Sequence, residues 1–301
     1  MKIAVVMPVD KVKPAGEFLG YDALKFTAKA AEDAGFHSVV VTDHPSPTGR
    51  WLDHGGHAAQ DPFVMLSFMA AATSRIQLQT GILVVPYRNP FIVARAVASL
   101  EAISNGRTIL GVGAGYLKGE YFAVGADFER RNDVVDEYIR AMRAALGQDE
   151  FDFEGTGYNA RGIRILPRPA QVPPIWVGGN SRRAIRRAAE LGDAWSPFNT
   201  GALVAGTART ATMQDSGELA EGLAYLRAHA DKIGKPPPKD IVLDSMKSPT
   251  EDWNAQALVD QIGAYGEMGV TWCSTHIPGE TRGEWKDNLD RWSAEVLAKV
   301  A

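Results

Sequence analysis

Short apolar segments rich in β-branched residues alternate with segments of helical periodicity along the chain, and this alternation restricts the possible folds more than any other feature. A helical segment follows each predicted strand, and strands connected in this way pair in parallel. Eight such units within 301 residues predict an α/β fold, a single (β/α)8 TIM barrel domain over residues 1–301. A doubly wound open sheet is the alternative. The predicted strands are Lys2–Val9, Ser38–Thr42, Ile76–Val85, Thr108–Gly113, Ile175–Val177, Ala194–Pro197, Ile241–Met246 and Thr271–Ile277.

Two connections exceed the usual length of barrel loops, so insertions are expected after the second and fourth strands. Residues 45–60 follow the second strand, and we interpret them as a lid over the mouth of the barrel. Residues 151–174 precede the fifth strand, and an irregular segment is expected there. Asp61-Pro62 and Asn89-Pro90 each place a capping side chain before a proline, which predicts the start of a helix at both points.

Charge and cysteine content argue against several classes of protein. The formal net charge is −4 and no long basic cluster occurs, which disfavours nucleic acid as a partner. Cys273 is the only cysteine, so an internal disulfide and a multi-cysteine metal site are excluded. No apolar segment approaches the length of a membrane span, and the first residues lack a signal-cleavage pattern. We therefore expect a cytoplasmic protein without a membrane partner.

A Gly-Gly step follows the fifth predicted strand and leads directly into a helix. Gly178 and Gly179 allow a ligand to approach the backbone, and Asn180-Ser181 can cap the helix. Unpaired N–H groups and the helix dipole at such a turn favour a negative charge. We interpret the turn as the site for the phosphate of a cofactor whose reactive end lies elsewhere. An ordinary strand–helix turn with two flexible glycines is the alternative, because the full dinucleotide fingerprint is absent.

The active site of a (β/α)8 barrel lies at the carboxyl ends of its strands, which selects a few residues. Asp43 and His44 end the second strand, and histidine titrates near neutrality and suits proton transfer. Gly81 lies inside the third strand, where glycine often marks a bulge or the close approach of a flat group. Gly113 and Gly115 remove side chains from the end of the fourth strand. The alternatives are a local cap beside a packed histidine, and turn chemistry alone at the glycines.

Two further clusters carry weaker signals. His54 and His57 lie near Asp53 and Asp61, but their spacing is not helical and the segment is rich in glycine, so no metal site is expected. The arginines between residues 182 and 187 are interpreted as mostly a solvated helix face, from which one of the first arginines assists the phosphate site.

The strand ends taken together resemble the luciferase-like monooxygenase superfamily. The resemblance is greatest to its branch of probable oxidoreductases that use the 8-hydroxy-5-deazaflavin coenzyme F420. It covers about residues 1–198, and the last hundred residues match only in the alternation of predicted strands and helices. The stretches that carry it are Val39–His44, Thr80–Pro90, Leu110–Tyr116 and Pro173–Ser181, and Ala189–Trp195 extends the last of them.

The resemblance implies a role for each strand end. The cofactor ring would lie against the third strand, where many members have a non-prolyl cis peptide, here Gly81-Ile82. The ring edge would face Asp43 and His44, and the phosphate would bind at the turn after the fifth strand. The residues implied to bind the cofactor are Asp43, Thr80, Gly81, Ile82, Gly113, Gly115, Tyr116, Gly178, Gly179, Asn180 and Ser181.

One position departs from the pattern of the related sugar-phosphate dehydrogenases. Those proteins have an acid directly after the Gly-x-Gly of the fourth strand, whereas this chain has Tyr116. A carboxylate general acid is therefore missing there unless Glu120 replaces it, which argues against a sugar-phosphate substrate. Trp51, Tyr87, Tyr116 and Trp195 are expected to form an apolar, aromatic pocket instead.

These features predict an F420-dependent oxidoreductase that transfers hydride between the deazaflavin and a small organic substrate with an activated C=C or carbonyl group. His44, with Asp43, would supply or steer the matching proton. The alternative within the superfamily is an FMN-dependent monooxygenase that uses reduced flavin and O2 and needs a separate reductase. A non-catalytic flavin-binding barrel is the alternative outside enzymes. The family also implies a homodimer.

Overall fold

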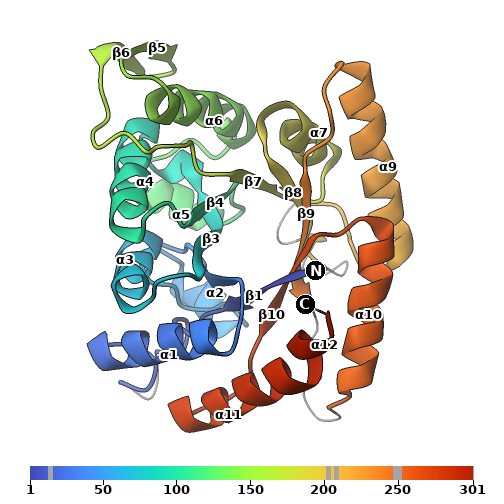
Figure 1. The fold of residues 1–301 in the computed structure, drawn as a ribbon. Coiled ribbons are helices and arrows are strands. Elements are labelled where there is room, and N and C mark those ends of the chain that lie inside the picture. Colours follow the sequence, from blue (N-terminus) through green and yellow to red (C-terminus); the bar gives the residue numbers. More distant parts are fainter. Residues whose placement is uncertain (13–15, 201–204, 207–209, 247–252, 301) are drawn as a thin grey trace.

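In the computed structural model, eight parallel strands close into a barrel (Figure 1). The structure describes residues 1–12, 16–200, 205–206, 210–246 and 253–300. The barrel is closed because β1 pairs with both β2 and β10, so the predicted (β/α)8 class is confirmed and the open sheet is excluded. The single-domain organisation stays a prediction. The strands are β1 (Lys2–Val6), β2 (Ser38–Val41), β3 (Gln77–Val84), β4 (Thr108–Gly113), β7 (Ile175–Gly178), β8 (Ala194–Ser196), β9 (Asp240–Met246) and β10 (Trp272–His276).

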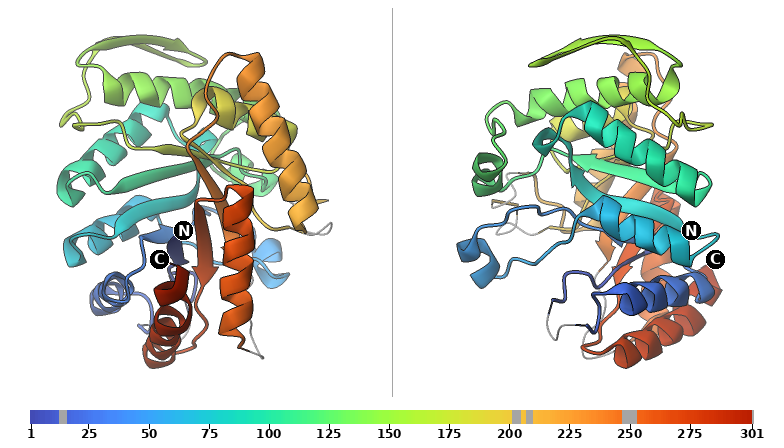
Figure 2. Two further views of the ribbon diagram at one scale, coloured as in Figure 1. Left: turned by 45° about the vertical axis from the view of Figure 1, so that its right-hand side comes forward. Right: turned by 90° about the vertical axis from the view of Figure 1, so that its left-hand side faces the viewer.

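Helices surround the barrel and connect successive strands (Figures 1 and 2). Both predicted Asx-Pro starts are confirmed: the Asp61 side chain accepts hydrogen bonds from two N–H groups of α3, and Asn89 accepts one from α4. The outer helices are α1 (Tyr21–Asp33), α3 (Pro62–Ala72), α4 (Pro90–Ser104), α6 (Arg131–Gly147), α7 (Arg182–Leu191), α9 (Ser216–Lys232), α10 (Ala255–Met268) and α11 (Arg282–Trp292). A short 3-10 turn (Val85–Tyr87) follows β3, and a π-helical segment (Ser293–Leu297) and α12 (Ala298–Val300) continue α11.

Both predicted insertions are present, and both contain regular structure. The segment after β2 includes the short helix α2 (Gly49–Asp53). The segment after β4 includes α5 (Lys118–Ala123), and an antiparallel hairpin of β5 (Phe151–Gly155) and β6 (Tyr158–Ile163) lies over α6 (Figure 2). The expectation of an irregular segment over residues 151–174 was wrong in its first half. The alternation in Phe151–Glu154, followed by a turn with two glycines, was the signal for this hairpin.

A separate small core closes the barrel at the amino ends of its strands. Ile109, Trp176, Ala194, Val242 and Trp272 are all buried in it. The rings of Trp176 and Trp272 meet edge to face with their centroids 5.0 Å apart. These side chains occupy the barrel interior at the amino ends of the strands, and a cavity lies at the carboxyl ends.

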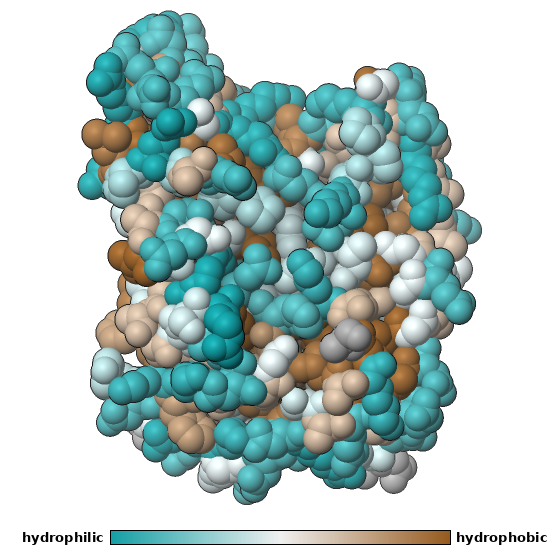
Figure 3. All heavy atoms as spheres, in the orientation of Figure 1, coloured by the Kyte–Doolittle hydropathy of each residue, from teal (hydrophilic) through white to brown (hydrophobic). Residues whose placement is uncertain are grey.

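The face of the molecule drawn in Figure 3 is predominantly polar. On the face drawn in Figure 3, hydrophilic side chains predominate around the rim, and apolar side chains are visible mainly toward the middle. None of the helices in the described ranges combines the length and apolar character that crossing a bilayer requires.

Candidate active site

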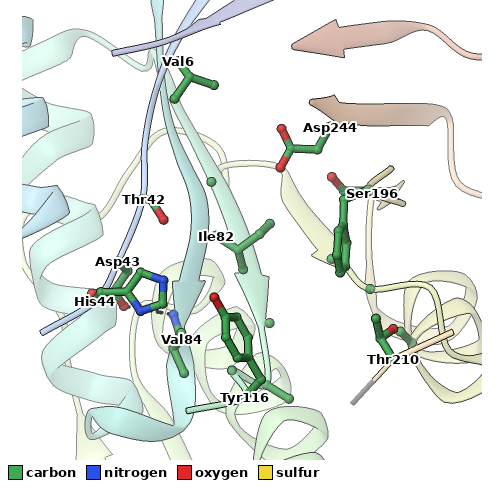
Figure 4. A pocket seen from close by; sticks show the side chains of 18 of the residues that line it. Val6, Thr42, Asp43, His44, Ile82, Val84, Tyr116, Ser196, Thr210 and Asp244 are labelled. Atoms are coloured by element: carbon green, nitrogen blue, oxygen red, sulfur yellow. Dashed lines mark hydrogen bonds between the residues drawn. The ribbon is translucent and has the colours of Figure 1, made fainter. Parts of the chain in front are cut away.

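A cavity of about 470 Å³ opens at the carboxyl ends of the barrel strands. This volume lies within the range usual for cofactor and small-molecule sites. His44 and Tyr116 lie on one side of it, Ser196 and Thr210 lie across from them, and Ile82 lies between (Figure 4). The predicted site residues that line it are Asp43, His44, Gly81, Ile82, Gly113, Gly115, Tyr116, Gly178, Gly179 and Ser181.

β3 departs from regular pairing in its middle. The Gly81-Ile82 peptide is cis, which confirms the expectation that the resemblance raised. The register between β3 and β4 shifts between Thr80 and Leu83, as it does at a bulge. A Cβ atom at position 81 would lie 2.2 Å from Cγ1 of Val40, so glycine is required there by the neighbouring strand.

The glycines of β4 and β7 make room for the Ile82 side chain. A Cβ atom at Gly113 would lie 2.9 Å from Ile82 Cγ2, and one at Gly178 would lie 3.0 Å from Ile82 Cδ1. Ile82 therefore occupies the space beside Gly113, while Gly113 still lines the cavity, and its expected contact with the cofactor stays a prediction. The result is an apolar surface, formed by Ile82, that faces the cavity (Figure 4).

Thr80 does not line the cavity, contrary to expectation. Its side chain is fully buried, and its hydroxyl donates a hydrogen bond of 2.8 Å to the carbonyl oxygen of Gly111. Thr80 therefore joins β3 to β4 just before the bulge.

Both carboxylate oxygens of Asp43 are held by other protein groups. The Arg88 guanidinium donates to Oδ2 at 2.6 Å and to Oδ1 at 2.8 Å, and the backbone N–H of Val84 donates to Oδ2 at 3.0 Å. Asp43 is 2% exposed. A buried carboxylate bound in this bidentate way serves to fix geometry. The structure therefore places Asp43 as a support for the backbone after the bulge rather than as a second proton-transfer group.

His44 lines the cavity and is supported from behind by Glu120. Its Nδ1 atom lies 3.2 Å from Oε2 of Glu120. The same carboxylate accepts hydrogen bonds from the Tyr87 hydroxyl at 3.0 Å and from the Ser46 N–H at 3.2 Å. Glu120, on α5, is 1% exposed and does not line the cavity. It thus acts on His44 and not in the position of the missing acid, where Tyr116 stands.

The aromatic pocket expected from four side chains is smaller than predicted. Tyr116 lines the cavity, and burial raises the pKa of its hydroxyl. Trp51, on α2, packs on His44 with ring centroids 4.7 Å apart. Tyr87 is engaged with Glu120, and Trp195 is fully buried and donates its indole N–H to the Gly179 carbonyl oxygen at 2.9 Å.

The turn between β7 and α7 has the shape of an anion site. Gly179 has φ +123°, a conformation that favours glycine. Ser181 caps α7 by accepting a hydrogen bond from the Ala184 N–H at 3.2 Å. Gly178, Gly179 and Ser181 all line the cavity, and α7 directs its N-terminal N–H groups toward it.

The Asn180 side chain braces this turn instead of facing the cavity. Its amide donates to the carbonyl oxygens of Phe198 and Ala211 at 2.9 and 3.1 Å, and its Oδ1 accepts from the Phe198 N–H at 3.0 Å. Its backbone N–H donates to the Thr210 hydroxyl at 3.2 Å, and Thr210 lines the cavity. The predicted ligand contact of Asn180 is therefore not one its side chain can make.

Two cationic side chains missed in the sequence border the same end of the cavity. Arg131 and Arg187 both line it. Arg187 is buried, pairs with Asp136 and donates to the Asn132 carbonyl oxygen at 2.8 Å, and burial lowers the pKa of its guanidinium. The expectation that Arg182 or Arg183 serves this end is corrected. Arg187 lies on the buried stripe of α7 with Ala184 and Ala188, and this periodicity was the signal that it is not on the solvated face.

Polar side chains from β9, β10 and the segments after β1 and β2 line the rest of the mouth. They are Asp10, His57, Asp244 and His276. His57 meets His44 edge to face at 4.9 Å, and its pKa is lowered by burial first and by His44 second. Asp244, which accepts a hydrogen bond from Ser274 at 2.5 Å, carried no sequence signal beyond its place in a strand. In the described part of the chain, no group of three or more His, Cys, Asp or Glu side chains is arranged to hold a metal ion.

Fold and site together define a (β/α)8 barrel in which a glycine turn at a helix N-terminus and a histidine line one cavity. The chain belongs to the luciferase-like monooxygenase family, whose sequence profile matches residues 1–246. An uncharacterized protein of Mycobacterium tuberculosis is 30% identical over 286 residues, which are 91% of this chain and 94% of that protein. The resemblance that the four stretches carry is therefore confirmed at the level of the family.

Two curated relatives are named for coenzyme F420. The F420-dependent hydroxymycolic acid dehydrogenase of Mycobacterium tuberculosis is 29% identical and covers 76% of this chain and 70% of its own. The F420-dependent glucose-6-phosphate dehydrogenase of Gordonia bronchialis is 37% identical, over 55% of this chain and 49% of its own. These relatives support the deazaflavin branch of the family.

Solved structures confirm the architecture. The monooxygenase RslO1 from Streptomyces bottropensis superposes with a TM-score of 0.79 at 20% identity, over the full length of both chains. An F420-dependent secondary alcohol dehydrogenase superposes with a TM-score of 0.76 at 19% identity and covers 99% of this chain and 98% of its own. At this identity the similarity establishes the barrel fold.

Proposed function

We propose that this chain is an oxidoreductase that uses coenzyme F420 to transfer hydride to or from a small organic substrate with an activated C=C or carbonyl group. The observation that carries the proposal is that the β7–α7 turn and His44 open into one cavity, with the Ile82 surface between them. The names of the two F420-dependent relatives support the deazaflavin over FMN.

The residues present fit such a cofactor. A Cβ atom at Gly179 would lie 2.9 Å from Cβ of Ala184, so glycine lets the turn pack this closely on α7. The N-terminal N–H groups of α7, with Arg131 nearby, would hold the anionic tail. The flat apolar surface of Ile82 would lie against the ring. When bound, the cofactor supplies the hydride chemistry.

The protein contributes orientation and proton transfer. With Nδ1 facing Glu120, His44 presents Nε2 as the nitrogen that accepts or donates the substrate proton. The Asp43–Arg88 pair fixes the backbone that follows the bulge. Trp51 and His57 cover His44 from the segment after β2, which excludes water from this side of the cavity. The lid role of residues 45–60 stays a prediction.

A parallel titration with F420 and FMN tests the proposal. Binding of each is followed by absorbance and by intrinsic tryptophan fluorescence, and turnover is measured on a panel of alcohols, carbonyls and enones. We expect F420 to bind and to be oxidised or reduced by a member of the panel. FMN binding with O2 uptake, dependent on a separate reductase, would instead select the monooxygenase. Tight binding of either molecule without turnover on any acceptor would favour the non-catalytic barrel.

We also propose a homodimer. α1, α3 and α4 lie side by side on one flank of the molecule (Figures 1 and 2), and their outer faces expose Tyr21, Val64, Phe68 and Ile92. The rings of Tyr21 and Phe68 meet at 6.3 Å, so this patch continues from α1 to α3. An apolar patch of this kind is typical of an interface. The cytoplasmic location stays a prediction from the sequence.

A further inference from the structure

Glu120 is a buried carboxylate with an unusual set of neighbours. Three groups lie within hydrogen-bond distance of its two oxygens: the Ser46 N–H at Oε1, and the Tyr87 hydroxyl and His44 Nδ1 at Oε2. Among the described residues, no Lys or Arg forms an ion pair with it, and His44 is its only partner able to carry a positive charge. Burying a carboxylate is costly unless its oxygens accept hydrogen bonds, so these three donors account for its stability.

The donors also determine which nitrogen of His44 carries the proton. The Ser46 N–H and the Tyr87 hydroxyl donate to Glu120, and a carboxylate only accepts hydrogen bonds. Nδ1 of His44 therefore donates, and the neutral ring has its proton on Nδ1 and a free lone pair on Nε2. Since the histidine lines the cavity and Glu120 does not, the lone pair belongs to the atom on the cavity side.

We propose that Glu120 is a positioning residue for the oxidoreductase reaction: it fixes His44 as the Nδ1–H tautomer and stabilises the positive charge that forms when Nε2 accepts a proton. Only the second part, the stabilisation of the positive charge on His44, rests on the proposed function. The tautomer is a property of the protein without cofactor or substrate. Glu120 lies on α5, away from the position after the Gly-x-Gly where the related sugar-phosphate dehydrogenases have an acid. It contacts His44 because the folded chain brings the two residues together.

Other ionisable groups around His44 do not replace Glu120. His57 faces it from the segment after β2, and burial lowers the pKa of His57, which favours its neutral form. Tyr116 faces it from the end of β4, with its ring centroid at 5.9 Å, and burial keeps its hydroxyl protonated. Asp43 is neutralised by Arg88, and Tyr87 lies behind Glu120 with its pKa raised by burial and by Glu120.

Glu120→Gln is the informative variant, because it preserves shape and removes one acceptor. The amide oxygen satisfies the Ser46 N–H, and the amide NH2 then faces Tyr87 and His44. An NH2 group donates to Nδ1, so the proton of the neutral ring moves to Nε2. An amide in place of the acid that orients a catalytic histidine lowers kcat by about 10²–10⁴-fold in enzymes of that design.

The first measurement is the 15N NMR signature of the His44 ring in the protein alone, assigned with His44→Gln. We expect an Nδ1–H tautomer in the wild type and an Nε2–H tautomer in Glu120→Gln. An Nε2–H ring in the wild type, or the same tautomer in both proteins, would overturn the proposal. Because no cofactor is present, this result is independent of whether F420 proves to be the cofactor.

The second measurement is the pH dependence of kcat with the loaded enzyme. In Glu120→Gln we expect kcat to fall at least 10²-fold. The limb of the pH–kcat profile that reports His44 should move to lower pH by about one unit. The Kd for the cofactor should change less than about 3-fold. An unchanged limb with a lower melting temperature would show that Glu120 is only structural. Loss of F420 turnover in the wild type would count against the proposed function and leave the tautomer result standing.

Two matched variants complete the experiment. Glu32→Gln removes another buried carboxylate that accepts backbone N–H hydrogen bonds, just before the amino end of β3 and outside the cavity lining, and we expect it to lower stability without moving the pH limb. Tyr87→Phe removes one hydrogen bond to Glu120 but leaves the negative charge of Glu120 in place, so the Nδ1–H tautomer of His44 should persist. A tautomer change in Tyr87→Phe equal to that in Glu120→Gln would contradict the role of the carboxylate.

Discussion

Asp43 and His44 are adjacent in the sequence, yet each is held by a different partner. Arg88 binds Asp43, and Glu120 contacts His44. A nearby acid and base that are separately paired in this way do not neutralise one another. His44 keeps a nitrogen for chemistry, and Asp43 supports the backbone of the site.

Replacing His44 tests its role most directly. In His44→Ala we expect kcat to fall by about 10²-fold or more, because general acid–base catalysis contributes about 10²–10⁴-fold. The Kd for the cofactor should change less than about 3-fold, since the anion site lies at the other end of the cavity. Steady-state kinetics and fluorescence titration provide the two quantities. Equal losses in both would contradict a proton-transfer role.

Glu32 gives a residue-scale prediction about stability and pH. Burial alone would raise its pKa, but the N–H groups of Arg75, Ile76 and Ser74 bind the carboxylate and lower the pKa to about 2. The pKa in the folded protein is thus below the ordinary value of 4.5, so the stabilisation is complete above pH 4.5 and is lost as the pH falls toward 2.

Urea unfolding across this range checks the prediction. The free energy of unfolding of the wild type should drop more steeply between pH 4.5 and pH 2 than that of Glu32→Gln. At pH 7 the variant should be less stable by about 1–3 kcal/mol, the cost of impairing buried hydrogen bonds to a charged group. Parallel curves for the two proteins would show that Glu32 does not carry this dependence.

At the scale of single residues, the sequence located the groups that end strands but not their partners. His44, Gly81 and Gly179 were found because barrel topology places strand ends at the mouth. Arg88 and Glu120 were not assigned their roles, because each meets its partner only through the folded chain. The partners of the Thr80 and Asn180 side chains were not predicted either. The resemblance indicates that these positions matter, but it does not indicate in which direction each side chain points.

In the proposed function, cofactor binding depends on the turn between β7 and α7. Its backbone is open because Gly179 has φ +123° and no Cβ atom. In Gly179→Val we expect the Kd for F420 to rise at least 10-fold while the circular dichroism spectrum stays that of the wild type. A strained backbone conformation of this kind costs of order 1–3 kcal/mol, less than the usual stability of a folded domain.

Gly157→Val is the matched control for this turn. Gly157 has φ +83°, lies in the β5–β6 turn and has no atom within 4 Å of the Cβ position. Gly157→Val therefore also places a β-branched residue at positive φ, but it leaves the cavity untouched. If Gly157→Val weakens F420 binding as much as Gly179→Val does, the β7–α7 turn is not the anion site.

Element prediction succeeded where a local signal existed. The Asx-Pro pairs fixed the starts of α3 and α4, and β-branched runs identified the barrel strands. α2 and α5 are five and six residues long, too short for a periodic signal, and α5 carries Glu120. The bulge in β3 was expected from the resemblance. The glycines around it accommodate the Ile82 side chain, which became evident only from the folded barrel, where three strands meet.

The whole molecule has one blocked and one open end. Trp176 and Trp272 close the barrel at the amino ends of the strands, and the insertions after β2 and β4 build up the other end. The order of strands followed from the sequence because parallel β/α units have few alternatives. The distribution of apolar side chains on the outer surface could not be predicted from the sequence, because their exposure depends on how the helices are rotated against the barrel.

The apolar flank predicts the oligomeric state. Phe68→Glu places a charge at the centre of the patch on α1, α3 and α4, and we expect it to convert a dimer into a monomer in light scattering coupled to size exclusion. Phe122→Glu is the control, since Phe122 is equally apolar, 69% exposed and carried by α5 outside the flank. A wild type that is monomeric at all concentrations would contradict the prediction.

The central claim is that a tricyclic redox ring occupies this cavity with its anionic tail at the β7–α7 turn. A crystal structure of the protein grown with F420 measures this directly. The claim predicts phosphate oxygens within hydrogen-bond distance of the backbone at Gly179 and Ser181, with the ring against Ile82 and its edge toward His44. A cavity closed by side chains, or a ligand whose phosphate lies away from this turn, would contradict it.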